Sequence, residues 1–176
     1  MASRTKKTLP STVATMAPAL GLDDKAREGV VDVLQGVLAD SHVLYIKLRK
    51  YHWNVTGPEF HALHQLFEQQ YTALADSIDE TAERIVQYGV SAIGSMKAFV
   101  ELSSLKEDAT DGLQLSATTM VERIVADHEA VVRKLRDDIE TVGEEYGDVA
   151  AEDYLTGLMQ AHQKFAWMTR AMIRGA

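Results

Sequence analysis

Residues 51–89 read YHWNVTGPEFHALHQLFEQQYTALADSIDETAERIVQYG. Within this stretch two pairs of polar residues are spaced four apart, and residues at i and i+4 project from the same face of a helix. Each pair could therefore hold a cation. Together with a histidine that precedes them, they make five potential metal ligands: His52, His64, Glu68, Asp79 and Glu83.

The separation of the two pairs limits what one chain can do. Glu68 and Asp79 are eleven residues apart. A helix rises about 1.5 Å per residue, which places them roughly 16 Å apart along the axis. Metal–ligand bonds are only about 2 Å long. If all five residues serve one site, the second pair must come from another copy of the chain.

The composition restricts the classes of protein to which the chain can belong. Its 176 residues suit one domain with a substantial core, and no apolar run approaches the ~20 residues of a membrane span. The chain has no cysteine, so a metal must be held by nitrogen and oxygen. The net charge of -8 favours cations over nucleic acid as partners of the folded body.

Residues 1–22 differ from the rest of the chain. They contain Arg4, Lys6 and Lys7 and no acidic residue. We expect a flexible basic arm over 1–22 and a folded domain over 23–176. The three basic residues are candidate DNA contacts, and a transit peptide is a compositional alternative for the arm.

Apolar residues recur every three or four positions in four long segments, which predicts four helices. The predicted helices span 24–54, 59–88, 116–146 and 148–174. The connection over 89–115 is long and holds a short amphipathic piece at 96–102, as in a crossover between antiparallel helix pairs. Thr119 with Glu122 resembles a capping box, and Asp148 can cap the last helix. The chain is therefore predicted to be an all-α four-helix bundle with one long crossover.

The ligand types indicate the metal. Imidazole and carboxylate together suit iron, zinc or manganese better than magnesium or calcium. Ordinary ferritins combine glutamates with Glu-x-x-His motifs inside one bundle, and none of the six histidines here follows a glutamate at that spacing. A two-fold dimer could instead bring the first three ligands of one subunit opposite the last two of the other, in two identical sites. Taken singly, each residue also fits a plainer role, as a histidine at a helix end or an acid on a solvated face.

At these positions the sequence resembles the Dps family, the DNA-binding proteins from starved cells or miniferritins. The resemblance covers about residues 24–174. The matching motifs are Tyr51-His52-Trp53-Asn54-Val55, Gly57, Phe60, Leu63-His64, Asp79-x-x-Ala82-Glu83-Arg84 and Phe165-Ala166-Trp167-Met168.

The resemblance implies a ferritin-like fold assembled as a hollow homo-dodecamer with ferroxidase sites at two-fold interfaces. It implies oxidation of Fe(II), preferably by hydrogen peroxide, and storage of ferric mineral in the shell, which protects DNA from oxidative damage. Iron is then the only cofactor, with no organic one. The implied location is the cytoplasm, in association with the nucleoid if the arm binds DNA, and not a membrane.

Carried over position by position, the resemblance assigns His52, His64 and Glu68 to one subunit and Asp79 and Glu83 to its mate. Glu68 stands where the family commonly has Asp, and its extra methylene can shift the carboxylate. Trp53 adjoins the site and can give electrons to a reactive intermediate; an aromatic core anchor is the alternative reading.

Rings of carboxylates can pass cations through a shell. By the same resemblance the start of the last helix offers the pore candidates Asp148, Glu152 and Asp153. Acids that stabilise a helix dipole from its first turn are the alternative. Four histidines have no matched ligand role: His42, His61, His128 and His162.

Two other functions remain open from the sequence. The first is a mainly structural DNA-compacting protein, in which the basic arms of many subunits bind phosphates together. The second is a manganese or zinc protein of the same architecture that does not oxidise iron.

Overall fold

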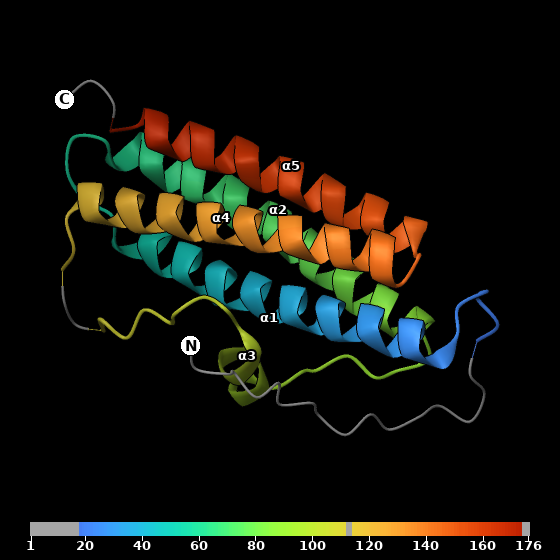
Figure 1. The fold of residues 1–176 in the computed structure, drawn as a ribbon. Coiled ribbons are helices and arrows are strands. Elements are labelled where there is room, and N and C mark those ends of the chain that lie inside the picture. Colours follow the sequence, from blue (N-terminus) through green and yellow to red (C-terminus); the bar gives the residue numbers. More distant parts are fainter. Residues whose placement is uncertain (1–17, 112–113, 174–176) are drawn as a thin grey trace, which may run out of the picture.

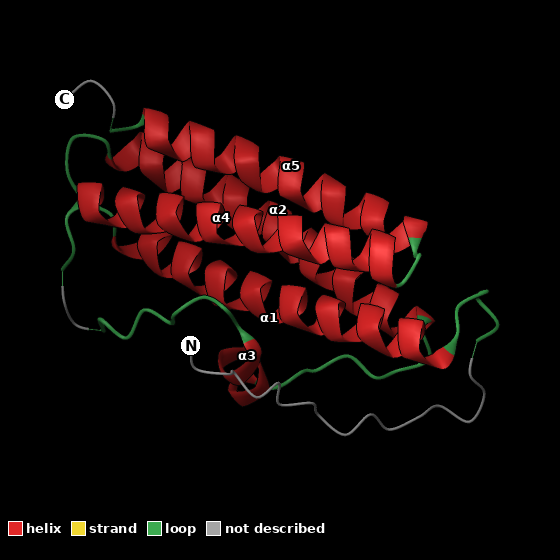
Figure 2. Ribbon diagram, viewed as in Figure 1, coloured by secondary structure: helices red, strands yellow, loops and turns green. Residues whose placement is uncertain are grey.

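The computed structural model describes residues 18–111 and 114–173. The regular elements in this part of the chain are helices, and Figure 2 shows them joined by loops. Four long helices lie side by side and a short one lies outside them (Figure 1). Their bounds are α1 Asp24–Asn54, α2 Phe60–Gln87, α3 Met96–Leu102, α4 Ala117–Glu140 and α5 Val149–Ala171. The predicted bundle with a short helix in its crossover is confirmed.

The direction of the helices explains the long crossover. α1 packs against α2, and α4 packs against α5. Figure 1 shows α2 and α4 running in the same direction, so the chain between them must return along the length of the bundle. The last turn of α1 and the first turns of α2 and α4 therefore share one end. The first turn of α5 lies at the other end.

Side-chain caps set where the helices begin. The Asp23 carboxylate accepts a hydrogen bond from the Ala26 amide at 2.8 Å, which starts α1. The capping box predicted from Thr119 and Glu122 is wrong, because Ser116 is the N-cap of α4 and its hydroxyl accepts from the Thr119 amide at 3.1 Å. The helix begins three residues earlier than a cap at Thr119 would require.

The helix predicted over 116–146 is interrupted. α4 ends at Glu140, and the π-helix η1, Thr141–Glu145, follows it. Tyr146, next in the chain, packs against Gly29 of α1 so closely that a Cβ on that glycine would lie 2.2 Å from its ring. This contact joins segments distant in sequence. The apolar spacing along one helix therefore could not predict the π-helix.

α1 supplies much of the core. Seven of its apolar side chains are completely buried: Val30, Leu34, Leu38, Ala39, Leu44, Leu48 and Tyr51. The helix also passes a test of length and composition for a membrane span, with a mean hydropathy of 1.2 in its best 18-residue window. Of that window 56% is buried within the bundle. The apolar character of α1 is thus accounted for by packing against the other helices.

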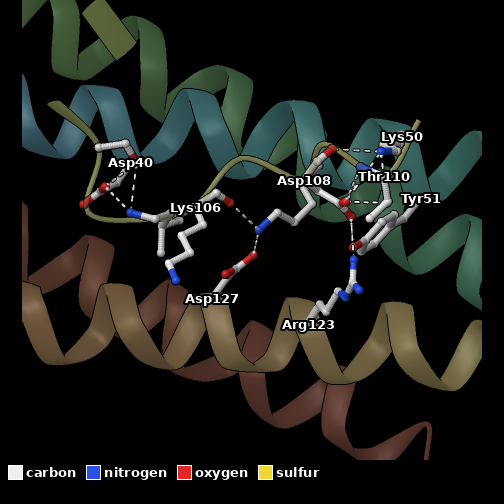
Figure 3. Close-up of polar contacts among 11 residues, drawn as sticks. Asp40, Lys50, Tyr51, Lys106, Asp108, Thr110, Arg123 and Asp127 are labelled. Atoms are coloured by element: carbon white, nitrogen blue, oxygen red, sulfur yellow. Dashed lines mark hydrogen bonds and ion pairs between the residues drawn. The ribbon is translucent and has the colours of Figure 1, made fainter. Parts of the chain in front are cut away.

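Polar contacts fix the crossover to the bundle (Figure 3). The Asp40 carboxylate of α1 accepts a hydrogen bond from the Ser103 hydroxyl at 2.8 Å. The buried Lys47 ammonium donates to the carbonyl of Lys106 at 2.9 Å and to the carboxylate of Asp127 on α4 at 2.6 Å. The crossover segment after α3 is therefore held to both α1 and α4.

A third anchor lies beside the end of α1. The Asp108 side chain is 4% exposed and accepts hydrogen bonds from the hydroxyls of Tyr51 and Thr110 and from Arg123 at 3.2 Å, as Figure 3 shows. Burial alone would raise the pKa of Asp108, but the hydrogen bonds from Thr110 and Tyr51, with the nearby Lys50 ammonium, hold that pKa well below its usual range. Because Tyr51 precedes His52, this anchor fixes the turn that carries the first predicted ligand.

Candidate metal centre

Two of the predicted ligands face each other across the turn between α1 and α2. Gly57 has a φ of 105°, a conformation that glycine adopts without strain, and it lets the chain reverse. His52 in the last turn of α1 is buried, and His64 in the second turn of α2 is half-buried. Their rings are stacked, with centroids 3.7 Å apart and planes 18° from parallel.

The backbone carbonyl of each histidine fixes the tautomer of the other imidazole. The Nδ1 atom of His52 lies 2.8 Å from the carbonyl oxygen of His64, and the Nδ1 atom of His64 lies 2.8 Å from the carbonyl oxygen of His52. A carbonyl oxygen only accepts, so both Nδ1 atoms must donate. In the neutral rings the lone pairs are then on the two Nε2 atoms. A histidine whose other ring nitrogen donates to a backbone carbonyl is the usual arrangement of a metal ligand.

Glu68 lies one turn beyond His64, on the exposed surface of α2. The Tyr71 hydroxyl donates to its Oε1 atom at 3.3 Å. Burial and the Glu68 carboxylate raise the pKa of Tyr71, which keeps the hydroxyl protonated and able to donate. The first three predicted ligands therefore lie at the same end of the bundle, with Tyr71 in contact with both Glu68 and His52.

We call His52, His64 and Glu68 the first half-site. An arginine and two aromatic rings border it. The Arg49 guanidinium carbon lies 4.9 Å from the Trp53 ring centroid and 5.8 Å from that of Tyr71. Trp53 is 62% exposed, so the reading of this residue as a core anchor is wrong. The indole lies on the surface and contacts the Arg49 guanidinium.

Asp79 and Glu83 are both exposed, farther along α2. Because α2 is one continuous helix, the eleven residues from Glu68 to Asp79 separate the two carboxylates by roughly 16 Å along its axis. Neither Asp79 nor Glu83 forms a hydrogen bond or ion pair with another residue that the structure describes, and the described residues contain no group of three or more ligands that could hold a metal. The described residues of one chain thus pair His52 with His64, place Glu68 on the next turn of α2, and leave Asp79 and Glu83 farther along that helix.

Comparison with known proteins gives the family. A family model described as the ferritin-like domain matches residues 31–175. A Bacillus anthracis protein named DNA protection during starvation protein 2 is 39% identical, over 82% of this chain and 96% of its own. This chain belongs to the Dps family.

Further comparisons agree with membership of the Dps family. The crystal structure of a Dps protein from Bacillus brevis superposes with a TM-score of 0.80 at 36% identity, covering 87% of this chain and 100% of the other. An uncharacterised low temperature-induced protein of Nostoc is 47% identical, over 89% of this chain and 86% of its own.

The three candidate pore residues differ in how exposed they are to solvent. Asp148 is buried, and its carboxylate accepts hydrogen bonds from the amides of Ala150 and Ala151 and from the Tyr88 hydroxyl. It is a helix cap, as the sequence predicted, and its oxygens already have partners. Glu152 is half-buried and Asp153 is exposed, so these two are the better placed to meet solvent.

The histidines without a matched role in the Dps family are also accounted for in part. His128 and His162 form a buried hydrogen-bonded pair between α4 and α5, and His42 stacks on Phe99 of α3 with ring centroids 3.7 Å apart. His61 is exposed. Arg4, Lys6 and Lys7, the candidate DNA contacts, lie outside the described residues.

Sequence reasoning missed Tyr71 and Arg49 as neighbours of the half-site. The contact between Tyr71 and Glu68 could have been predicted, because residues three apart are neighbours on a helix surface. Arg49 also lies four residues from Tyr45 and from Trp53 on α1, so helical spacing places those two rings beside it. Only its contact with Tyr71 depends on how α1 and α2 pack, and spacing within one helix could not have predicted that contact.

Proposed function

We propose that this Dps protein is a ferroxidase and iron store. It binds Fe(II) between two-fold related subunits of a cytoplasmic homo-dodecamer, oxidises it preferentially with hydrogen peroxide and keeps the ferric product inside the shell. Protection of DNA from oxidative damage follows, because iron and peroxide are both removed.

The reciprocal hydrogen bonds of His52 and His64 are the observation that carries the proposal. They leave both Nε2 lone pairs free for a metal and fix the two rings before it arrives, which reduces the entropy lost on binding. Glu68 supplies an oxygen next to them. Asp79 and Glu83, exposed on the same helix, are the oxygens that a second subunit would provide.

The chemistry needs little from the protein beyond position and charge. Two Fe(II) ions give one electron each to one hydrogen peroxide, its O–O bond breaks, and two protons complete two waters. Carboxylates favour the product because Fe(III) carries more charge than Fe(II). Trp53, which is exposed and follows His52 in the chain, is proposed to reduce an oxidising species that escapes this two-electron step.

The shell also needs a route for iron. We propose Asp153 and Glu152 as the carboxylates that line it, with Asp148 acting as the cap of α5. The oxygens of Asp148 are occupied by two backbone amides and the Tyr88 hydroxyl, which is why it contributes to helix stability and not to cation passage.

The proposal is tested by loading the assembled protein with Fe(II) without oxygen and then adding hydrogen peroxide. We expect iron-dependent oxidation in the wild type and a loss of at least about tenfold in rate in the His52→Ala, His64→Ala double variant, since even residues that only support metal ligands matter that much. His61→Ala is the matched control, because His61 is exposed one turn before His64. If the assembled double variant oxidised iron as fast as the wild type, the proposal would be wrong.

The same experiment distinguishes a manganese or zinc protein of this architecture. Such a protein would bind its own metal at the histidines, and adding peroxide after anaerobic iron loading would produce no protein-dependent oxidation. Metal analysis of the loaded protein would show which ion it retains.

We propose DNA binding through Arg4, Lys6 and Lys7 as a second function, supported by the concentration of positive charge in the first 22 residues of an acidic chain. Many arms on one shell would bind phosphates together, with an affinity that falls steeply as salt rises. Deletion of residues 1–20 should abolish retardation of DNA in a gel. Unchanged retardation would show that the arm is not the contact.

A further inference from the structure

One side chain touches two of the three ligands in the first half-site. The Tyr71 hydroxyl donates to Glu68 Oε1 at 3.3 Å. The ring of the same tyrosine meets the His52 ring edge to face, with centroids 5.2 Å apart and planes at 83°. Tyr71 is on α2 and His52 on α1, so the tyrosine connects ligands that come from different helices.

The surroundings hold the Tyr71 ring in place. Tyr45 of α1 packs against it edge to face, with centroids 6.1 Å apart. The Arg49 guanidinium lies over both tyrosine rings and donates a hydrogen bond to the Tyr45 hydroxyl at 3.1 Å. Packing and cation–π contacts of this kind restrict a ring to one orientation. The hydroxyl of Tyr71 is therefore presented to Glu68 from a fixed position.

Glu68 needs such support more than an aspartate would. A glutamate has one more rotatable bond, and this bond must become ordered when a metal binds. Glu68 is exposed, and among the described residues its carboxylate accepts a hydrogen bond from Tyr71. A hydrogen bond to one carboxylate oxygen restricts the side chain and leaves the other oxygen free for a cation.

We propose that Tyr71 is a positioning residue for iron binding, which orders the Glu68 carboxylate beside His52 so that the longer side chain can act as a ligand. The inference rests on the proposed function, since it assigns a supporting residue to the same site. It explains how the chain can use a glutamate at this position.

The test is an anaerobic titration of the assembled protein with Fe(II), which measures binding without turnover. Tyr71→Phe removes the hydroxyl and keeps the ring, and we expect it to weaken Fe(II) affinity about tenfold, the effect usual for residues that orient ligands. Tyr146→Phe is the control, because it removes a tyrosine hydroxyl from the opposite end of the bundle, where Tyr146 packs against Gly29 and not against Tyr71 or Glu68. Thermal unfolding of both variants should match the wild type.

A double-mutant cycle isolates the contact with Glu68. Glu68→Asp withdraws the carboxylate from Tyr71, so adding Tyr71→Phe to Glu68→Asp should have no further effect on Fe(II) affinity. Equal weakening by Tyr71→Phe with and without Glu68→Asp would overturn the proposal, as would equal weakening by the control Tyr146→Phe.

Failure of the inference can be separated from failure of the proposed function. In one outcome the His52→Ala, His64→Ala double variant loses Fe(II) binding, but Tyr71→Phe binds Fe(II) as tightly as the wild type. Only the role of Tyr71 is then refuted. If the wild type itself shows no binding that depends on these histidines, the proposed function is refuted and the role of Tyr71 with it.

Discussion

His128 and His162 make the bundle core sensitive to acid. The His128 Nε2–H donates to Gln70 Oε1 at 3.2 Å, so the His128 Nδ1 lone pair accepts from His162 Nδ1–H at 2.9 Å. Gln70 in turn donates to the Thr169 hydroxyl at 2.7 Å. This chain of hydrogen bonds requires a neutral His128, because a protonated His128 has no lone pair with which to accept from His162. Burial lowers the pKa of His162 to about 4 and holds that of His128 well below its usual value.

This pair predicts that stability falls as the pH drops below about 6.5. As the pH falls below about 6.5, each histidine of the unfolded chain binds a proton, while the buried histidines of the folded chain do not. Their contribution to the free energy of unfolding is therefore present above about pH 6.5. For His162 it is lost progressively as the pH falls toward the folded pKa of about 4. For His162 alone the loss between pH 7 and pH 5 should be about 2 kcal/mol. Thermal unfolding at the two pH values would measure it.

His162→Gln should be less stable than the wild type at pH 7 but lose less stability between pH 7 and pH 5. His61→Gln, which removes an exposed histidine, should keep the full dependence. Identical pH dependence in the wild type and His162→Gln would show that the core pair is not responsible.

Individual residues were predictable where a single helix determined their position. The spacing of His64 with Glu68 and of Asp79 with Glu83 places each pair on one face of α2, as expected. The reciprocal bonds of His52 and His64 could not be predicted, because they depend on how two helices and the turn between them meet. The same holds for the partners of Asp108, which come from α1, the crossover and α4.

Within α1, two glycines have opposite surroundings. A Cβ on Gly29 would lie 2.2 Å from the Tyr146 ring, which no relaxed structure allows. A Cβ on Gly36 would meet the Lys134 ammonium at 3.5 Å, an ordinary contact. Helix propensity favours alanine at both positions, so packing decides the difference.

We predict that Gly29→Ala destabilises the protein by about 1–3 kcal/mol through overpacking. Gly36→Ala should stabilise it by about 0.5–1 kcal/mol, because alanine has the higher helix propensity. Denaturant unfolding would measure both changes. In a Tyr146→Ala background Gly29→Ala should no longer destabilise, and destabilisation that persists there would contradict the assigned cause.

The helices themselves were largely predictable, since α1, α2, α3 and α5 begin within one residue of the positions inferred from apolar spacing and caps. The end of the third long helix was not. η1 replaces its last turn beside the contact between Tyr146 and Gly29, a tertiary interaction that leaves no periodic signal in the sequence.

The whole molecule is expected to be active only as an assembly. The His52 side of the proposed centre lies at the junction of α1 and α2, while Asp79 and Glu83 lie roughly 16 Å or more along α2. A two-fold axis would bring each group opposite the complementary group of a second subunit. Each dimer would then contain two sites, and every site would use both chains.

Complementation between two inactive variants tests this arrangement most directly. One variant carries His52→Ala with His64→Ala, and the other carries Asp79→Ala with Glu83→Ala. Neither should oxidise Fe(II) when assembled alone. In a mixed dimer one site combines the intact histidines of one chain with the intact carboxylates of the other, and the second site lacks both groups.

Equal amounts of the two variants, co-assembled with random pairing, should recover about a quarter of the wild-type ferroxidase rate, because half the dimers are mixed and half of their sites are complete. Mixing without subunit exchange should recover nothing and serves as the control. Recovery of about a quarter is the predicted result. No recovery after verified co-assembly, or full activity in either variant alone, would contradict a metal centre shared between two chains.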